Sequence, residues 1–153
     1  DKELQRLKIL EEYFEENNIV HNGNYIYATR QERNLNSFWL LGLSGLLFKS
    51  AQPYYILFRE DEILFFKMKV LGGIKELSFI MKVEDIKSIV LKKGLLSYSL
   101  IIKVETDGKV KKEIINFIKI NGKAWWLQNR NNLIESGYFD RLKEKVDRRN
   151  LLN

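Results

Sequence analysis

The segment from residue 97 to residue 105 restricts the possible folds more than any other part of the chain. Its residues alternate between two sets, and the mostly apolar set is Tyr98, Leu100, Ile102 and Val104. This period of two is that of a β-strand with one buried face. The next four residues, 106–109, include an Asp-Gly pair, which tolerates the positive φ angles of a tight hairpin. The segment therefore predicts two antiparallel strands joined by a short turn.

The same reasoning predicts seven antiparallel strands in all. Apolar runs bounded by turn-forming residues cover residues 24–30, 53–58, 63–69, 74–82, 86–93, 97–105 and 111–120. Strands so close together in sequence favour a meander that closes into a barrel or sandwich. The 153 residues suit one domain with a substantial core, and the chain has no cysteine for a disulfide. We expect a mainly β fold, a seven-stranded antiparallel barrel with flanking helices.

An amphipathic helix is predicted at the N-terminus, over residues 2–17. Its apolar residues recur at spacings of three and four, at Leu4, Leu7, Leu10 and Phe14. A helix of this length is marginal by itself and needs a surface that covers this stripe. That surface is either the domain itself or another copy of the chain. Residues 1–23 form the first of three expected parts.

A second helix is predicted after the last strand. Asn121 is expected to cap a helix that starts at Lys123. At 100° per residue, one face collects Trp126, Leu127, Arg130, Leu133 and Ile134. This face suits the open end of a barrel, so Trp126 is expected to be buried and Trp125 much more exposed. The barrel and this helix make up residues 24–137, and a charged helical extension covers residues 138–153.

The uncharged run at residues 38–48 is the least ordinary stretch of the sequence. It is too short to span a bilayer, which requires about 20 apolar residues. Three interpretations remain open: a buried connection, a segment that dips into lipid, and an apolar patch for a partner. The candidate residues for membrane or partner contact are this run's start and its basic flanks, namely Arg30, Arg33, Phe38, Trp39, Leu40, Leu41 and Lys49.

The later strands are rich in lysine, and the chain carries a net charge of +6. The candidate basic face consists of Lys92, Lys93, Lys111 and Lys112. Such a face can meet phosphate, anionic lipid or an acidic partner. The alternative is that these lysines provide solubility and prevent edge strands from pairing.

The sequence offers no recognisable catalytic or metal-binding motif. It lacks the phosphate-binding pattern G-x-x-x-x-G-K-S/T and the zinc-binding pattern H-E-x-x-H. The only histidine, His21, lies in an Asn-rich turn and is expected to be a solvated loop residue. We therefore expect no enzyme activity, no metal and no cofactor.

Seven short antiparallel strands followed by a C-terminal helix resemble the bacterial pleckstrin-homology-like (PH-like) domains. The resemblance rests on strands 54–59 and 63–69 around Asp61 and Glu62, the corner at residues 83–86, and the helix with Trp126 and Leu133. It implies a scaffold that binds lipids, peptides or proteins. Phosphoinositide-binding members use basic residues on the first two strands. In this chain those positions offer Arg30, Arg33, Lys49 and Arg59, which the apolar run separates, so no known site is carried over.

These observations favour a non-enzymatic binding or adaptor domain in the cytoplasm or at the inner face of the membrane. Its expected partner is a protein or an anionic membrane surface, and self-association is expected to use the N-terminal helix or residues 38–48. The alternative is a nucleic-acid-binding module that uses the Lys-rich strands and an exposed Trp125.

Overall fold

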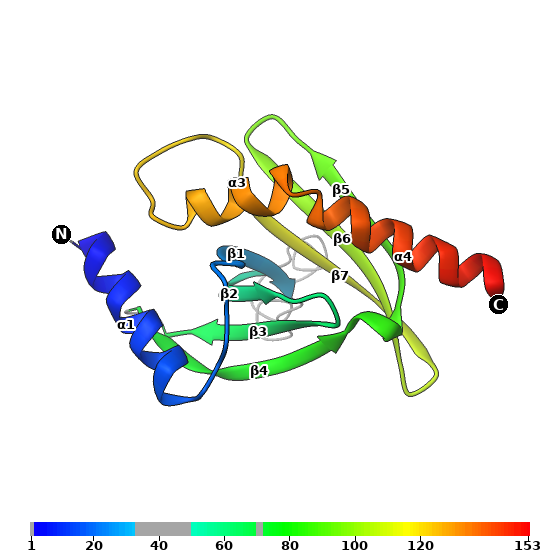
Figure 1. Cartoon of the computed structure of the whole chain (residues 1–153), viewed down its shortest axis with the longest axis horizontal. Coiled ribbons are helices and arrows are strands. Elements are labelled where there is room, and N and C mark those ends of the chain that lie inside the picture. Colours follow the sequence, from blue (N-terminus) through cyan, green and yellow to red (C-terminus); the bar gives the residue numbers. More distant parts are fainter. Residues whose placement is uncertain (1, 33–49, 70–71) are drawn as a thin grey trace, which may run out of the picture.

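Seven strands form one antiparallel sheet in the computed structural model, which describes residues 2–32, 50–69 and 72–153 (Figure 1). One helix precedes the sheet and two follow it. In chain order the elements are α1 (Lys2–Glu16), β1 (Tyr25–Glu32), β2 (Ser50–Phe58), β3 (Glu62–Met68), β4 (Ile74–Lys82), the 3-10 turn η2 (Val83–Asp85), β5 (Ile86–Lys93), β6 (Ser97–Thr106), β7 (Lys109–Ile118), α3 (Leu127–Glu135) and α4 (Tyr138–Leu152). The mainly β, seven-stranded prediction is confirmed.

The strand order is β4-β3-β2-β1-β7-β6-β5, so β1 joins two halves of the sheet. β1 pairs with β2 along its full length, but among the described residues it pairs with β7 only through Thr29–Asn116 and Arg30–Ile115. β4 and β5 follow each other in the chain, yet they form the two outer edges of the sheet. The prediction of a closed barrel is therefore wrong.

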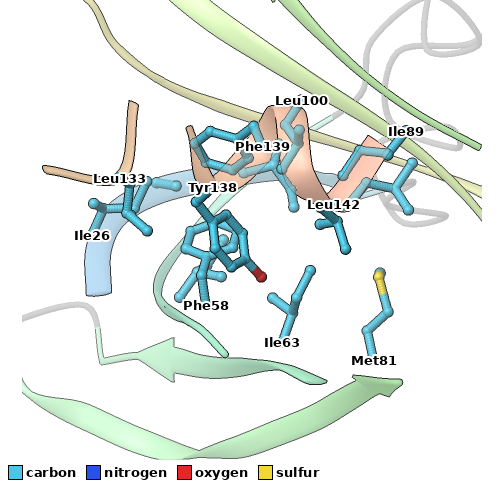
Figure 2. Close-up of a cluster of buried hydrophobic side chains, with 14 of the residues drawn as sticks. Ile26, Phe58, Ile63, Met81, Ile89, Leu100, Leu133, Tyr138, Phe139 and Leu142 are labelled. Atoms are coloured by element: carbon cyan, nitrogen blue, oxygen red, sulfur yellow. The ribbon is translucent and has the colours of Figure 1, made fainter. Parts of the chain in front are cut away.

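Helix α4 explains why the two edges stay apart. Its residues Tyr138, Phe139 and Leu142 lie between side chains from the two halves of the sheet (Figure 2). Near its end, Arg149 donates hydrogen bonds to the backbone carbonyl oxygens of Val83 (3.1 Å) and Ile86, at the corner between β4 and β5. The space that a barrel would close is thus filled by a helix whose sequence is mostly charged.

The main core lies between the concave side of the sheet and helices α3 and α4. It contains residues from both halves of the sheet and from both helices, including Ile56, Phe65, Leu100, Ile115, Leu133 and Val146. Trp126, at 8% exposure, belongs to this core as predicted. The helix begins later than predicted, because Trp126 occupies its N-cap position. Asn121 does not cap it, and its side chain instead accepts a hydrogen bond from Arg130 (2.7 Å).

A second cluster on the opposite face of β2 and β3 holds helix α1. Leu10 and Phe14, each 1% exposed, pack there against Tyr25, Leu57 and Phe66. The helix is therefore covered by its own domain, although Leu4 remains 62% exposed. Because both faces are covered, β2 and β3 contain continuous apolar runs rather than alternating ones.

A β-irregularity interrupts the side-chain alternation of β5. Strict alternation would turn Ile86 away from Ile89, but both lie in the main core. The pairing of β5 with β6 shifts register between Ile86 and Ser88. An extra residue at such a shift moves the following side chains to the other face, which sequence alternation cannot reveal.

Candidate functional site

Of the seven predicted contact residues around the apolar run, the structure describes only Arg30. Arg33, Phe38, Trp39, Leu40, Leu41 and Lys49 lie outside the described residues. Arg30 is described and lies in β1, where the two halves of the sheet meet.

Arg30 is held by groups of its own domain. Its Nε and Nη2 atoms donate to the two carboxylate oxygens of Glu113 at 2.7 and 2.9 Å, and Nη1 donates to Glu32 at 2.8 Å. The hydroxyl of Tyr54 donates to the same Glu32 oxygen at 2.6 Å, and the guanidinium lies 4.5 Å from the centre of the Phe79 ring. Burial lowers the pKa of Arg30, but the hydrogen bonds and charge of Glu113 outweigh this and raise it. Arg30 thus ties β1 to β7, and its guanidinium is engaged by side chains of its own domain.

The four lysines of the predicted basic face do not lie together. Lys92 and Lys93 pair with Ser99 and Tyr98 on β6, whereas Lys111 pairs with Val104 and Lys112 with Lys103. Ser99 and Val104 are five positions apart in β6, which is about 17 Å along a strand. The two lysine pairs therefore belong to opposite ends of the β5–β7 half.

The turn between β5 and β6 presents apolar side chains beside two lysines. Leu95 is 89% exposed and Leu96 is 61% exposed. The turn is closed by a hydrogen bond from the Gly94 amide to the Ser97 carbonyl (2.9 Å). Lys92 and Lys93 are exposed at the end of β5, and no described carboxylate forms an ion pair with either one.

The end of β7 lies against this turn. The Lys119 amide donates to the Leu96 carbonyl (3.0 Å), and the Lys119 ammonium donates to the Gly94 carbonyl (3.2 Å). Ile118 and Ile120, on either side of Lys119, are 44% and 51% exposed. We call this surface the basic apolar end, and it consists of Lys92, Lys93, Leu95, Leu96, Ile118, Lys119 and Ile120.

An apolar groove of about 280 Å³ adjoins the basic apolar end. It opens where β1 and β7 diverge beyond their two paired positions, and Tyr27, Phe117 and Trp126 contribute rings to its lining. Leu96 and Ile118 belong both to the groove and to the basic apolar end. The apolar surface therefore continues from the turn into the sheet.

A larger hollow of about 440 Å³ lies between the loop before β1, the β2–β3 turn and the start of α4. Its two arginines are balanced by neighbours, because Arg59 pairs with Glu62 (2.9 Å) and Arg141 with Glu60 (3.2 Å). The Tyr138 hydroxyl donates to the Arg59 carbonyl (2.6 Å). Burial, and then the charge of Glu60, raise the pKa of Tyr138. These groups hold the loops together.

His21 lines that hollow but is not the solvated residue that was expected. Its ring is half-buried and packs against Phe14 and Tyr25, with ring centres 5.1 and 4.9 Å away. Its Nδ1 accepts a hydrogen bond from the Gly23 amide (3.3 Å). His21 therefore closes the loop that leads from α1 to β1.

Trp125 is less buried than Trp126, as predicted, but it is not an exposed ring. It is half-buried and packs against Tyr25 and Tyr55, with ring centres 5.6 and 6.1 Å away. A base stacked on its face would have to compete with these tyrosines, so this residue gives little support to the nucleic-acid alternative.

Sequence reasoning missed Leu95, Leu96, Ile118, Lys119 and Ile120. A detectable signal was present, since Lys-Lys-Gly-Leu-Leu places two large apolar residues in a turn, where polar residues are the rule.

Within the described ranges, no group of three or more histidine, cysteine or carboxylate side chains is placed to hold a metal ion. Among those same residues, no helix combines the length and the apolar composition needed to cross a membrane. The chain matches no model of a known protein family and no curated protein.

Proposed function

We propose that this chain is a non-enzymatic, PH-like binding domain that attaches to an anionic membrane surface through the basic apolar end. The PH-like relation is supported by the seven-stranded antiparallel sheet with a C-terminal helix packed on it. The contact surface differs from the one that the resemblance implies, because it lies on the later strands. Arg30, on the first strand, is engaged by Glu113 and Glu32.

The observation that carries the proposal is that exposed apolar side chains lie beside basic residues in segments that contain no acidic residue. Residues 86–104 and 114–134 contain lysines and one arginine but no aspartate or glutamate. The acidic residues of this half lie away from the basic apolar end. Glu105 and Asp107 are at the β6–β7 turn, and Glu113, near the middle of β7, is paired with Arg30. An anionic surface would therefore be attracted to one end of the sheet in particular.

A membrane explains this composition better than a protein partner does. Lysine is depleted at the centres of protein interfaces. Near an anionic bilayer, by contrast, each lysine contributes on the order of 1 kcal/mol, and its long side chain can reach the headgroups while neighbouring apolar groups go deeper.

Vesicle co-sedimentation tests this proposal. The double variant Lys92→Glu/Lys93→Glu should bind phosphatidylcholine–phosphatidylglycerol vesicles at least about 30-fold more weakly than the wild type, since two favourable contributions are lost and reversed. The matched control, Lys111→Glu/Lys112→Glu, makes the same change of charge at the other end and should bind nearly as well as the wild type. Binding of the wild type should weaken as salt is added.

The results that would overturn the proposal are equally specific. Equal losses in the two double variants would show that net charge alone matters and not the basic apolar end. If the wild type does not bind anionic vesicles but binds single-stranded DNA, the result would favour the nucleic-acid alternative. Retrieval of one acidic protein through Lys92 and Lys93, without vesicle binding, would favour an adaptor that contacts proteins.

A further inference from the structure

We propose that Leu95 and Leu96 are a hydrophobic anchor that enters the apolar layer of the bilayer, while Lys92 and Lys93 remain at the headgroups. This inference rests on the proposed function and adds a second kind of contact to it. Charge attraction alone would leave the side chains at the tip in water. An inserted turn would place them in hydrocarbon.

The geometry of the turn suits insertion. Leu95 and Leu96, at 89% and 61% exposure, are the most exposed large apolar residues between β1 and α4 in the described chain. They occupy the tip of the β5–β6 connection, at the same end of the sheet as the loop from β7 to α3 (Figure 1). Both side chains are therefore largely open to solvent at this end of the sheet.

Backbone polar groups usually prevent a turn from entering lipid, because each unsatisfied group there costs several kcal/mol. This turn satisfies three of them internally. The Gly94 amide bonds to the Ser97 carbonyl, the Leu96 carbonyl accepts from the Lys119 amide, and the Gly94 carbonyl accepts from the Lys119 ammonium. The same bonds fix the turn in advance, so little ordering is needed on binding.

The positive charge of the basic apolar end favours anionic lipid as its partner over a second copy of this chain. Two copies that met through the basic apolar end would bring Lys92, Lys93 and Lys119 of each copy together in an apolar contact. Like charges placed this way are repulsive. Anionic headgroups neutralise the same lysines, and Ile118 and Ile120 widen the apolar surface that faces them.

A fluorescent label can report insertion directly, because the chain contains no cysteine. Leu95→Cys, labelled with a polarity-sensitive NBD group, should shift its emission to the blue and brighten when phosphatidylcholine–phosphatidylglycerol vesicles are added. Lipid-borne quenchers in the acyl region should then dim it. The control is Thr106→Cys with the same label, which lies at the opposite end of β6 and should show neither change.

A second pair of variants separates the apolar contribution from the electrostatic one. Leu95→Ala/Leu96→Ala should weaken vesicle binding by about tenfold or more, since apolar area is lost from the contact. Leu151→Ala/Leu152→Ala makes the same substitutions at residues that are 86% and 87% exposed at the end of α4, and it should bind normally. Circular dichroism should show that both variants keep the wild-type fold, as the altered side chains are exposed.

The outcomes distinguish this inference from the proposed function. If the label at residue 95 stays in water while Lys92→Glu/Lys93→Glu still abolishes binding, insertion is wrong and electrostatic attachment stands. If Leu95→Ala/Leu96→Ala binds vesicles as the wild type does, insertion is also wrong. If the wild type binds no anionic vesicle, both proposals fail. Blue-shifted emission together with the tenfold loss supports insertion.

Discussion

The substitution Glu113→Gln tests whether Arg30 serves the fold or a ligand. Breaking a fully buried ion pair costs about 3–5 kcal/mol, because the remaining charge loses its partner. The two side chains are 21% and 11% exposed, and Arg30 keeps Glu32, so we expect a loss of about 2–3 kcal/mol in the free energy of unfolding. For a domain of this size that lowers Tm by roughly 4–10 °C. Urea denaturation followed by tryptophan fluorescence would measure the loss.

Two variants control this experiment. Glu105→Gln removes an exposed pair, with Lys87 at 3.0 Å, and should cost less than about 1 kcal/mol. The double variant Arg30→Met/Glu113→Leu replaces the pair by apolar groups and should recover much of the stability lost in Glu113→Gln. A loss in Glu113→Gln no larger than that in Glu105→Gln would refute the structural role of the pair. Arg30 would then return as a candidate ligand-binding residue.

Two further predictions concern the packing of α1 and the buried tyrosines. Phe14→Ala should cost about 3–5 kcal/mol in urea denaturation, because Phe14 is 1% exposed. Leu4→Ala, on the same helix but 62% exposed, should cost less than about 0.5 kcal/mol, and equal effects would contradict the observed docking of α1. Burial, and then the charge of Glu11, raise the pKa of Tyr25 from 10.0 to about 12, so the unfolded chain loses this proton at lower pH than the folded protein does. The stabilisation that protonated Tyr25 provides should therefore be fully present below pH about 10 and be lost as pH rises through about 12; a loss of stability over this range that is as large in Tyr25→Phe as in the wild type would contradict this.

The local elements of the fold were predictable because their signals are local. The turn at Asp107 and Gly108 has φ angles of 53° and 75°, the positive values that the Asp-Gly pair indicated. Barrel closure was predicted wrongly because it depends on α4, whose buried face consists of only Tyr138, Phe139, Leu142 and Val146 among many charged residues. Residues 138–152 alone do not show whether this helix packs on the sheet or extends into solvent.

The candidate site was harder to predict than the fold because it is assembled from distant segments. Arg30 and Glu113 are 83 positions apart, and no local sequence pattern predicts their pairing. Lys92 and Lys111 look equivalent in sequence, but strand register places them at opposite ends. Leu95 and Leu96 carried a readable signal, since apolar residues in a turn need an explanation, but the support from Lys119 becomes visible only in the structure.

The joint between β1 and β7 also determines how the domain can fold. Every other pairing of the described strands joins neighbours in the chain, whereas Thr29 and Asn116 are 87 positions apart. Local hairpins form quickly, while a contact across such a separation requires closure of a long loop and is slow. We therefore expect two ribbons, β1–β4 and β5–β7, to form first and to be joined last by two residue pairs, the Arg30–Glu113 ion pair and the α4 side chains. A variant that weakens the Arg30–Glu113 ion pair would then slow the final step of folding, while the early formation of both ribbons would stay unchanged.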